Sequence, residues 1–122
     1  MTPQEMVEEF HKKFNVYQEP NPDLPTNHSV LGRLRLLLEE AFELAKGFHD
    51  DDLEQVADAL GDLAYIVYGT AAVCGIDLLP IIAEVHRSNM TKDPGYFKPV
   101  KGKNYSPPNI REVLERQMKN EQ

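Results

Sequence analysis

Residues 36–69 read LLLEEAFELAKGFHDDDLEQVADALGDLAYIVYG and carry the strongest structural signal in the chain. Apolar side chains recur every three or four positions on both sides of the acidic run, which is the period of an amphipathic α-helix. The aspartates of that run, Asp50 and Asp51, are residues that favour turns and helix starts. The stretch therefore predicts two helices joined by a short turn.

The same period extends this prediction to the rest of the chain. We expect helices at about residues 3–14, 30–48, 52–74 and 78–90, a loop at 17–28, and a short polar helix from about residue 110 to 119. Ser29 and Asp77 are the expected N-caps of the second and fourth helices, and Gly75 is the expected end of the third. Because no segment alternates apolar and polar residues, no strand is expected. The sequence predicts an all-α fold of four to five helices in one domain, residues 1–122.

Composition narrows the classes of protein to consider. The chain has 122 residues, 13 basic and 20 acidic side chains and a formal net charge of -7, which disfavours binding to nucleic acid or anionic lipid. Cys74 is the single cysteine, as expected in a reducing compartment. The first residues lack a signal-peptide pattern, and the longest uncharged run, residues 63–76, is too short to span a bilayer. We expect a cytoplasmic protein with no membrane partner.

Acidic side chains share one face on each of the two central helices. They are Glu39, Glu40 and Glu43 on the first helix and Glu54, Asp58 and Asp62 on the second. Such rows are common on solvated helix faces. Carboxylates at this spacing on neighbouring helices can also converge on Mg²⁺, which takes oxygen ligands. Asp62 favours the second interpretation, because residues 63–74 are apolar or small nearly all round and a bare buried charge is costly.

The segment after the fourth predicted helix has a different composition. Residues 93–109 form a loop rich in proline and glycine that interleaves lysines with aromatic side chains. These lysines would be ordinary surface residues in a neutral account. In a chain of net charge -7, their clustering suits closure over phosphates, and the aromatic rings suit stacking on a base. The substrate-binding residues expected from this pattern are Lys92, Tyr96, Lys98, Lys101, Lys103 and Tyr105.

In the acidic residues of its two central helices, the chain resembles the MazG-like superfamily of all-α nucleoside triphosphate pyrophosphohydrolases. This superfamily includes dimeric dUTPases, dCTP pyrophosphatases and phosphoribosyl-ATP pyrophosphohydrolases, and the resemblance covers about residues 33–93. Its first motif, two adjacent glutamates with a third three residues on, is met by Glu39, Glu40 and Glu43. Asp62 matches the aspartate that ends the second motif. The stretches DALGDLAYIVYGTAAVCGIDL and HRSNMTK look closer to the phage and bacterial MazG-like subgroup than to the histidine-pathway enzymes.

One position departs from the superfamily pattern. The second motif usually has a glutamate three residues before its aspartate, where this chain has Ala59. The nearest acid is Asp58, and we expect it to replace the missing ligand. The run NMTKDPGY is similar to a dimeric dUTPase element in which an asparagine is followed by a basic residue and then Gly-Tyr. This similarity assigns Asn89 to substrate binding, although an asparagine at a helix end more often has a capping role.

The resemblance implies an activity and a cofactor. Mg²⁺, with Mn²⁺ as an alternative, would be held by Glu40, Glu43, Asp58 and Asp62 while Glu39 orients or deprotonates the water; the metal and base roles are exchangeable among the glutamates. Hydrolysis between the α and β phosphorus atoms would convert a (deoxy)nucleoside triphosphate to the monophosphate and pyrophosphate, a nucleotide-pool housecleaning reaction. Ala59 keeps open a non-catalytic nucleotide- or partner-binding protein of the same fold, and a purely structural helical oligomer is a third interpretation.

Assembly follows from the packing of so few helices. The third predicted helix is apolar on most sides, and three other modest helices cannot cover that surface alone. We therefore expect a homodimer or a dimer of dimers in which oligomerisation completes a MazG-like helical bundle.

Overall fold

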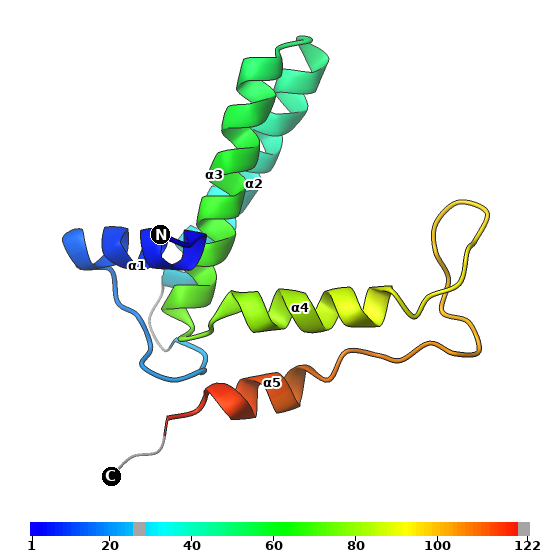
Figure 1. Cartoon of the computed structure of the whole chain (residues 1–122). Coiled ribbons are helices and arrows are strands. Elements are labelled where there is room, and N and C mark those ends of the chain that lie inside the picture. The colour runs from blue at the N-terminus through cyan, green and yellow to red at the C-terminus, as the bar shows by residue number, and fades with distance from the viewer. Residues whose placement is uncertain (26–28, 120–122) are drawn as a thin grey trace. The chain divides into compact units, whose positions relative to one another are not determined.

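The computed structural model describes residues 1–25 and 29–119, and within them the backbone forms five α-helices. They are α1 (Pro3–Lys13), α2 (Ser29–His49), α3 (Leu53–Val73), α4 (Leu78–Asn89) and α5 (Ile110–Gln117), as Figure 1 shows. The described backbone has no strand beyond one isolated antiparallel bridge between Asp93 and Val100. The all-α prediction is therefore confirmed.

The helix ends follow the local chemistry of the sequence. Asp52 caps α3 by accepting a hydrogen bond from the backbone N–H of Gln55 at 3.1 Å. Gly75 ends the same helix with a φ of 67°. Its N–H donates to the carbonyl of Ala72 and the next N–H, of Ile76, donates to the carbonyl of Ala71, which is the Schellman arrangement. The expected glycine end of this helix is confirmed.

The other expected caps have different outcomes. Asp77 caps α4 as expected, because its side chain accepts from the N–H of Leu79 at 3.3 Å. Ser29 is already the first residue of α2, so the cap position of that helix lies outside the described residues. The expected loop at 17–28 is described as far as residue 25.

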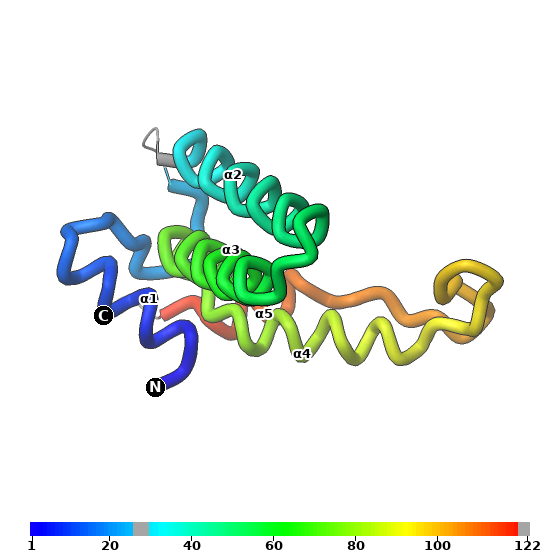
Figure 2. Tube along the Cα trace, turned by 90° about the horizontal axis from the view of Figure 1, so that it is seen from above, coloured from blue at the N-terminus to red at the C-terminus, as the bar shows by residue number. Residues whose placement is uncertain are grey.

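The chain divides into two compact units, residues 1–76 and 77–122. In the first unit α2 and α3 form an antiparallel hairpin, and α1 crosses α3 (Figures 1 and 2). The core of this unit is small and lies along α3, with buried Val7, Val56, Ala59, Ala71, Ala72 and Val73. The prediction of one domain over residues 1–122 stays a prediction.

The apolar stripe of α2 does not contribute to this core. Leu38 and Phe42 are 73% and 71% exposed, since α2 packs on α3 through another face. That inner face contains half-buried Leu37, Glu40 and Leu44 and ends at buried Gly47. Of the carboxylate row, Glu40 therefore faces the neighbouring helix, together with Leu37 and Leu44, while Glu39 and Glu43 are exposed.

The second unit contains α4, α5 and the long segment between them. Among its described residues, Val113 of α5 and Ser88 of α4 are buried. Asn109 caps α5 by accepting from the N–H of Glu112 at 3.2 Å. The loop expected at residues 93–109 is present, and its first turn is closed by the bridge between Asp93 and Val100.

In the described part of the chain, α3 is the one helix whose length and composition would allow it to cross a bilayer. Its most apolar window has a mean hydropathy of 1.3, and a third of that window is buried inside the structure. The core helix of a soluble protein has the same properties, so this feature alone decides nothing about a membrane.

Candidate active site

The α2–α3 hairpin brings the two carboxylate rows together. In an antiparallel pair, residues that face each other lie at equal distances along the chain from the turn. Glu40 of α2 and Asp62 of α3 occupy such facing positions, and both side chains are half-buried. Of the four acids assigned to metal binding from the sequence, Glu40 and Asp62 therefore face each other between the two helices, whereas Glu43 and Asp58 are exposed.

Glu40 shows the electrostatic consequence of this convergence. Loss of hydration raises the pKa of Glu40 above its ordinary value, and Asp62 raises it further through its charge and a hydrogen bond between the two side chains. The charges of Glu43 and Asp58 act in the same direction. Three carboxyl groups from the two helices are thus close enough to Glu40 to raise its pKa.

Glu43 is held at the edge of this group by a neighbour on α3. The side-chain amide of Gln55 donates to the backbone carbonyl of Glu43 at 3.2 Å and to its carboxylate Oε2 at 3.2 Å. These two hydrogen bonds link α2 to the first turn of α3. They also fix the direction of the Glu43 side chain.

Glu39, the residue assigned to orienting water, lies in a different environment. Its Oε1 accepts from Nε of Arg35 at 3.1 Å in an exposed ion pair on α2. Glu39 is not among the groups that shift the pKa of Glu40. Its assignment as the catalytic base stays a prediction.

Ala59 stands where the superfamily motif usually has a glutamate, and it lies in the protein core. Its side chain is 2% exposed and belongs to the core of the first unit, on the face of α3 that also carries Asp62. Asp58, the expected replacement ligand, is exposed and reaches Glu40 through its charge. A core side chain therefore occupies the position where the superfamily usually has a glutamate.

The donors fit a hard divalent cation in kind. Glutamate and aspartate oxygens are the ligands that Mg²⁺ prefers, and the four acids contribute no sulfur or imidazole. As the side chains stand, no three histidine, cysteine, aspartate or glutamate groups in residues 1–25 and 29–119 are arranged to hold a metal ion. Side-chain rotation at Glu40, Glu43, Asp58 and Asp62 would be needed to form the coordination shell.

The residues assigned to substrate binding lie in the second unit. Asn89 is the last residue of α4, and the lysine and tyrosine positions follow it in the loop. Tyr96 is fully exposed at the turn between the bridged residues, and Nζ of Lys101 lies 5.3 Å from the ring centre of Tyr105. Whether these residues bind a substrate together with the carboxylates stays a prediction.

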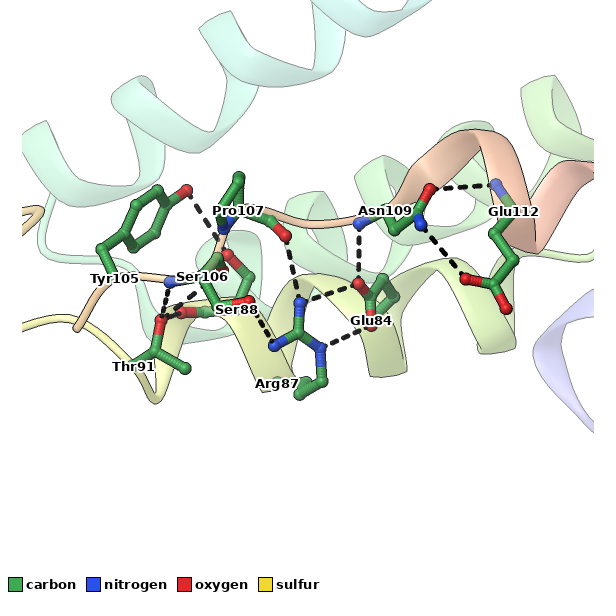
Figure 3. Close-up of polar contacts among 9 residues, drawn as sticks. All are labelled: Glu84, Arg87, Ser88, Thr91, Tyr105, Ser106, Pro107, Asn109 and Glu112. Carbon is green, nitrogen blue, oxygen red and sulfur yellow. Dashed lines mark hydrogen bonds and ion pairs between the residues drawn. The ribbon is translucent and has the colours of Figure 1, made fainter.

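A network of hydrogen bonds, which the sequence did not reveal and which we call the clasp, joins α4 to the end of this loop (Figure 3). The guanidinium of Arg87 donates to both carboxylate oxygens of Glu84 at 2.7 and 2.9 Å, to Oγ of Ser106 at 3.0 Å and to the carbonyl of Pro107 at 3.1 Å. The N–H of Asn109 donates to the same Glu84 carboxylate at 2.7 Å. The spacing of Glu84 and Arg87, three residues apart on one helix face, was the available signal.

This clasp has a marked electrostatic effect. Hydrogen bonds from Arg87 and from the Asn109 backbone lower the pKa of Glu84 to about 2. A shallow surface pocket is lined by these residues and by Ser106, Pro107, Pro108 and Glu112. Because the polar groups inside it already bond to one another, we assign it a structural role in positioning the loop.

The sequence patterns also did not predict a second polar cluster, which lies in the first unit. His11 of α1 is 3% exposed, and its Nε2 lies 3.0 Å from Nη2 of Arg33 while Nδ1 lies 3.1 Å from Oε1 of Gln18. Arginine can only donate, so Nε2 accepts and the ring proton is on Nδ1, where it bonds Gln18. Burial lowers the pKa of His11. The cluster ties α1 to α2.

Comparison with known proteins assigns the family. Residues 7–89, more than half of the 122 residues, match the model of the phosphoribosyl-ATP pyrophosphohydrolase family. The chain belongs to this family. Its resemblance to the MazG-like all-α pyrophosphohydrolases is thereby confirmed, and the family assignment supports a pyrophosphohydrolase type of activity.

All five assigned acids and Asn89 lie within residues 7–89, which match the family model. The assigned lysines and tyrosines come after residue 89. A segment of 46 residues is also 44% identical to the uncharacterized protein L479 of Acanthamoeba polyphaga mimivirus. That segment covers 38% of this chain and 18% of the viral protein. The chain thus corresponds to a small part of this relative, whose name assigns no activity.

Proposed function

We propose that this protein is a Mg²⁺-dependent nucleoside triphosphate pyrophosphohydrolase that converts a (deoxy)nucleoside triphosphate to the monophosphate and pyrophosphate. The observation that carries the proposal is the surrounding of Glu40, where carboxyl groups from α2 and α3 crowd together in a half-buried position. Like charges in such a place are unfavourable without a counter-ion. The family assignment supports the same class of reaction.

The proposed roles follow the sequence assignment. Glu40, Glu43, Asp58 and Asp62 would hold Mg²⁺ or Mn²⁺, which when bound neutralises charge on the phosphates and favours attack by water. Glu39 would orient that water or accept its proton, and its ion pair with Arg35 would have to open for this. The water oxygen bonds to one phosphorus, the bond between the α and β phosphates breaks, and pyrophosphate leaves.

Substrate contacts are proposed for the end of α4 and the loop. Positive side chains suit phosphate oxygens, and exposed rings such as that of Tyr96 suit a base. The assigned residues are Asn89, Lys92, Tyr96, Lys98, Lys101, Lys103 and Tyr105. The resemblance of residues 58–78 and 86–92 to the phage and bacterial subgroup favours an ordinary nucleotide over the histidine-pathway substrate.

We further propose that the active protein is a homodimer or a dimer of dimers in the cytoplasm, without nucleic acid or membrane partners. The exposed apolar stripe of α2 supports self-association, since Leu31, Leu38 and Phe42 are each at least 71% exposed. A second copy offers an identical stripe, and C₂ pairing of identical faces is the commonest form of assembly.

The deciding experiment is a substrate panel with Mg²⁺. It should contain the common ribo- and deoxyribonucleoside triphosphates together with phosphoribosyl-ATP, and both the released phosphate species and the nucleotide product should be measured. We expect pyrophosphate and the monophosphate. Release of orthophosphate would show that a different bond is cleaved, and preference for phosphoribosyl-ATP would show that the substrate class is wrong.

Buried Ala59 favours one alternative, a non-catalytic nucleotide- or partner-binding protein of the same fold. With one ligand position occupied by a methyl group, the remaining acids could bind a metal–nucleotide complex without turning it over. Nucleotide binding in the absence of hydrolysis across the whole panel would select this alternative.

A further inference from the structure

Two places of very close approach occur along the contact between α2 and α3. The first is Gly47 in the last turn of α2, which is buried. A methyl group at this position would lie 2.9 Å from Cγ2 of Val56 and 3.0 Å from the backbone nitrogen of the same residue. Because one of these atoms belongs to the backbone, α3 itself would have to move to admit a larger side chain.

The second place is Gly69 near the end of α3, which is also buried. Here a methyl group would lie 3.1 Å from Nη1 of Arg33 and 3.3 Å from Nε2 of His11. Both ring nitrogens of His11 are hydrogen-bonded, and the ring is 3% exposed, so it has little room to retreat. Gly69 thus leaves the space through which Arg33 reaches from α2 across α3 to α1.

These two contacts flank the carboxylate pair symmetrically. On α2, residues 33, 40 and 47 are seven apart, and on α3, residues 69, 62 and 55 are seven apart in the opposite direction. Seven residues are two helical turns, or about 10.5 Å. Gly69 at one end makes room for the Arg33 and His11 side chains, and Gly47 at the other lies against the side chain and backbone nitrogen of Val56. Glu40 and Asp62 lie midway between these two close contacts.

We propose that Gly47 and Gly69 are positioning residues that set the distance between α2 and α3 and thereby allow Glu40 and Asp62 to share a cation. The importance of this spacing for metal binding rests on the proposed function. Neither glycine touches the acids. An alanine at position 47 would push directly against the backbone of α3, and an alanine at position 69 would displace the Arg33 side chain through which α2 contacts α3 there. Either change would alter the packing of the two helices beside the carboxylates.

The chain itself contains matched controls. Gly32 on α2 and Gly61 on α3 have nothing within 4 Å of the position that a methyl group would take. Alanine at these two positions should favour the helix slightly, because glycine is a poor helix former. The four glycine-to-alanine variants therefore make the same chemical change in the same two helices and differ only in whether the new methyl group meets a neighbour.

The first measurement is Mn²⁺ affinity by calorimetry on the full chain. We expect Gly47→Ala and Gly69→Ala to weaken binding about tenfold or more, as for changes that disturb ligand orientation from outside the coordination shell. Gly32→Ala and Gly61→Ala should stay within about twofold of wild type. Val7→Ala removes buried methyl groups from α1 and serves as the control for lost stability without a change in this helix spacing.

The second measurement is the geometry of the metal-free variants by crystallography. The separation of the Glu40 and Asp62 carboxylates should increase in Gly47→Ala and return toward the wild-type value in Gly47→Ala/Val56→Ala, which removes the nearest methyl group. An unchanged separation in Gly47→Ala would overturn the proposal. If wild type binds no Mn²⁺, the proposed function fails, whereas this structural measurement still decides the role of the glycines.

Discussion

At the scale of single residues, Glu40 is where burial and charge conflict most directly. It is half-buried between two helices, with other acids nearby that raise its pKa. A group placed this way lowers the stability of the empty protein, and residues that do so are commonly retained for binding or catalysis. Removing the charge of Glu40 should therefore raise the stability of the metal-free protein and weaken metal binding.

Replacing Glu40 by glutamine should separate these two effects. The metal-free variant should be more stable than wild type at pH 7, because one of several crowded negative charges is gone, while Mg²⁺-dependent turnover should be lost. Urea unfolding with and without Mn²⁺ measures both, with Glu54→Gln on the exposed side of α3 as the control. A metal-free variant less stable than wild type would contradict this account of Glu40.

Asp62→Asn and Glu43→Gln should each abolish pyrophosphate release while leaving helicity intact. An amide oxygen is a weaker ligand for a hard cation than a carboxylate, and neither residue lies in the core. Steady-state kinetics and circular dichroism of the purified variants provide the measurement. Full activity in either variant would remove that residue from the catalytic set.

His11 should give the protein a pH dependence near neutrality. Burial lowers its pKa from 6.5, the hydrogen bond with Gln18 acts in the opposite direction, and Arg33 lowers it further. The unfolded chain therefore takes up the proton first, so this contribution to stability is complete above about pH 6.5 and is lost as the pH falls further.

The test is to compare unfolding free energies of wild type and His11→Gln between about pH 7.5 and pH 5. Glutamine can accept from Arg33 without titrating, so the loss of stability on acidification should be smaller in the variant. His86→Gln on the exposed side of α4 is the matched control. Equal pH dependence in wild type and His11→Gln would show that His11 does not cause it.

At the scale of elements, the clasp between α4 and the segment before α5 holds the loop that carries the assigned lysines. It links Glu84 and Arg87 of α4 to Asn109, the cap of α5. Two further hydrogen bonds add to it, from the N–H of Ser106 to Oγ1 of Thr91 at 2.8 Å and from Oγ of Ser88 to the hydroxyl of Tyr105 at 3.4 Å. The end of the loop, residues 105–109, is therefore tied back to α4 and the residues just after it.

The clasp should resist acid more than an ordinary carboxylate would. Because the pKa of Glu84 falls from 4.5 to about 2, its stabilising effect is present above pH 4.5 and is lost as the pH falls toward 2. The amide resonance of Asn109, which donates to Glu84, should move with a midpoint at about 2 in a nuclear magnetic resonance titration. A midpoint at 4.5 would mean that the clasp is absent in solution.

Helix positions were predictable because caps and periodicity are local properties. α1 and α4 begin at the residues expected from proline and aspartate signals, and α3 begins one residue later than expected, with Asp52 as its cap. Each of the five described helices ends within about two residues of its expected position. The faces of α2 were harder to assign. Its leucine stripe indicated a core that the described residues do not form, since α3 covers the opposite face.

At the scale of the whole molecule, that exposed stripe supports a partner. Phe42→Asp should favour the monomer, because a charge in an apolar interface typically costs about 2 kcal/mol or more when it replaces a large anchor. Light scattering across a concentration series measures the mass. A wild-type protein that is monomeric at all concentrations would count against assembly, and an unchanged mass in Phe42→Asp would place the interface elsewhere.

The amino-acid sequence by itself determined that this protein is helical, where its helices begin and end, and which acids share a helix face, because each of these depends on neighbours within one or two turns. Only the tertiary structure decided that Glu40 meets Asp62 and that Ala59 is buried in the core. Those relations depend on how α2 rotates against α3. Close contacts at Gly47 and Gly69 belong to that packing, and no local pattern reveals them.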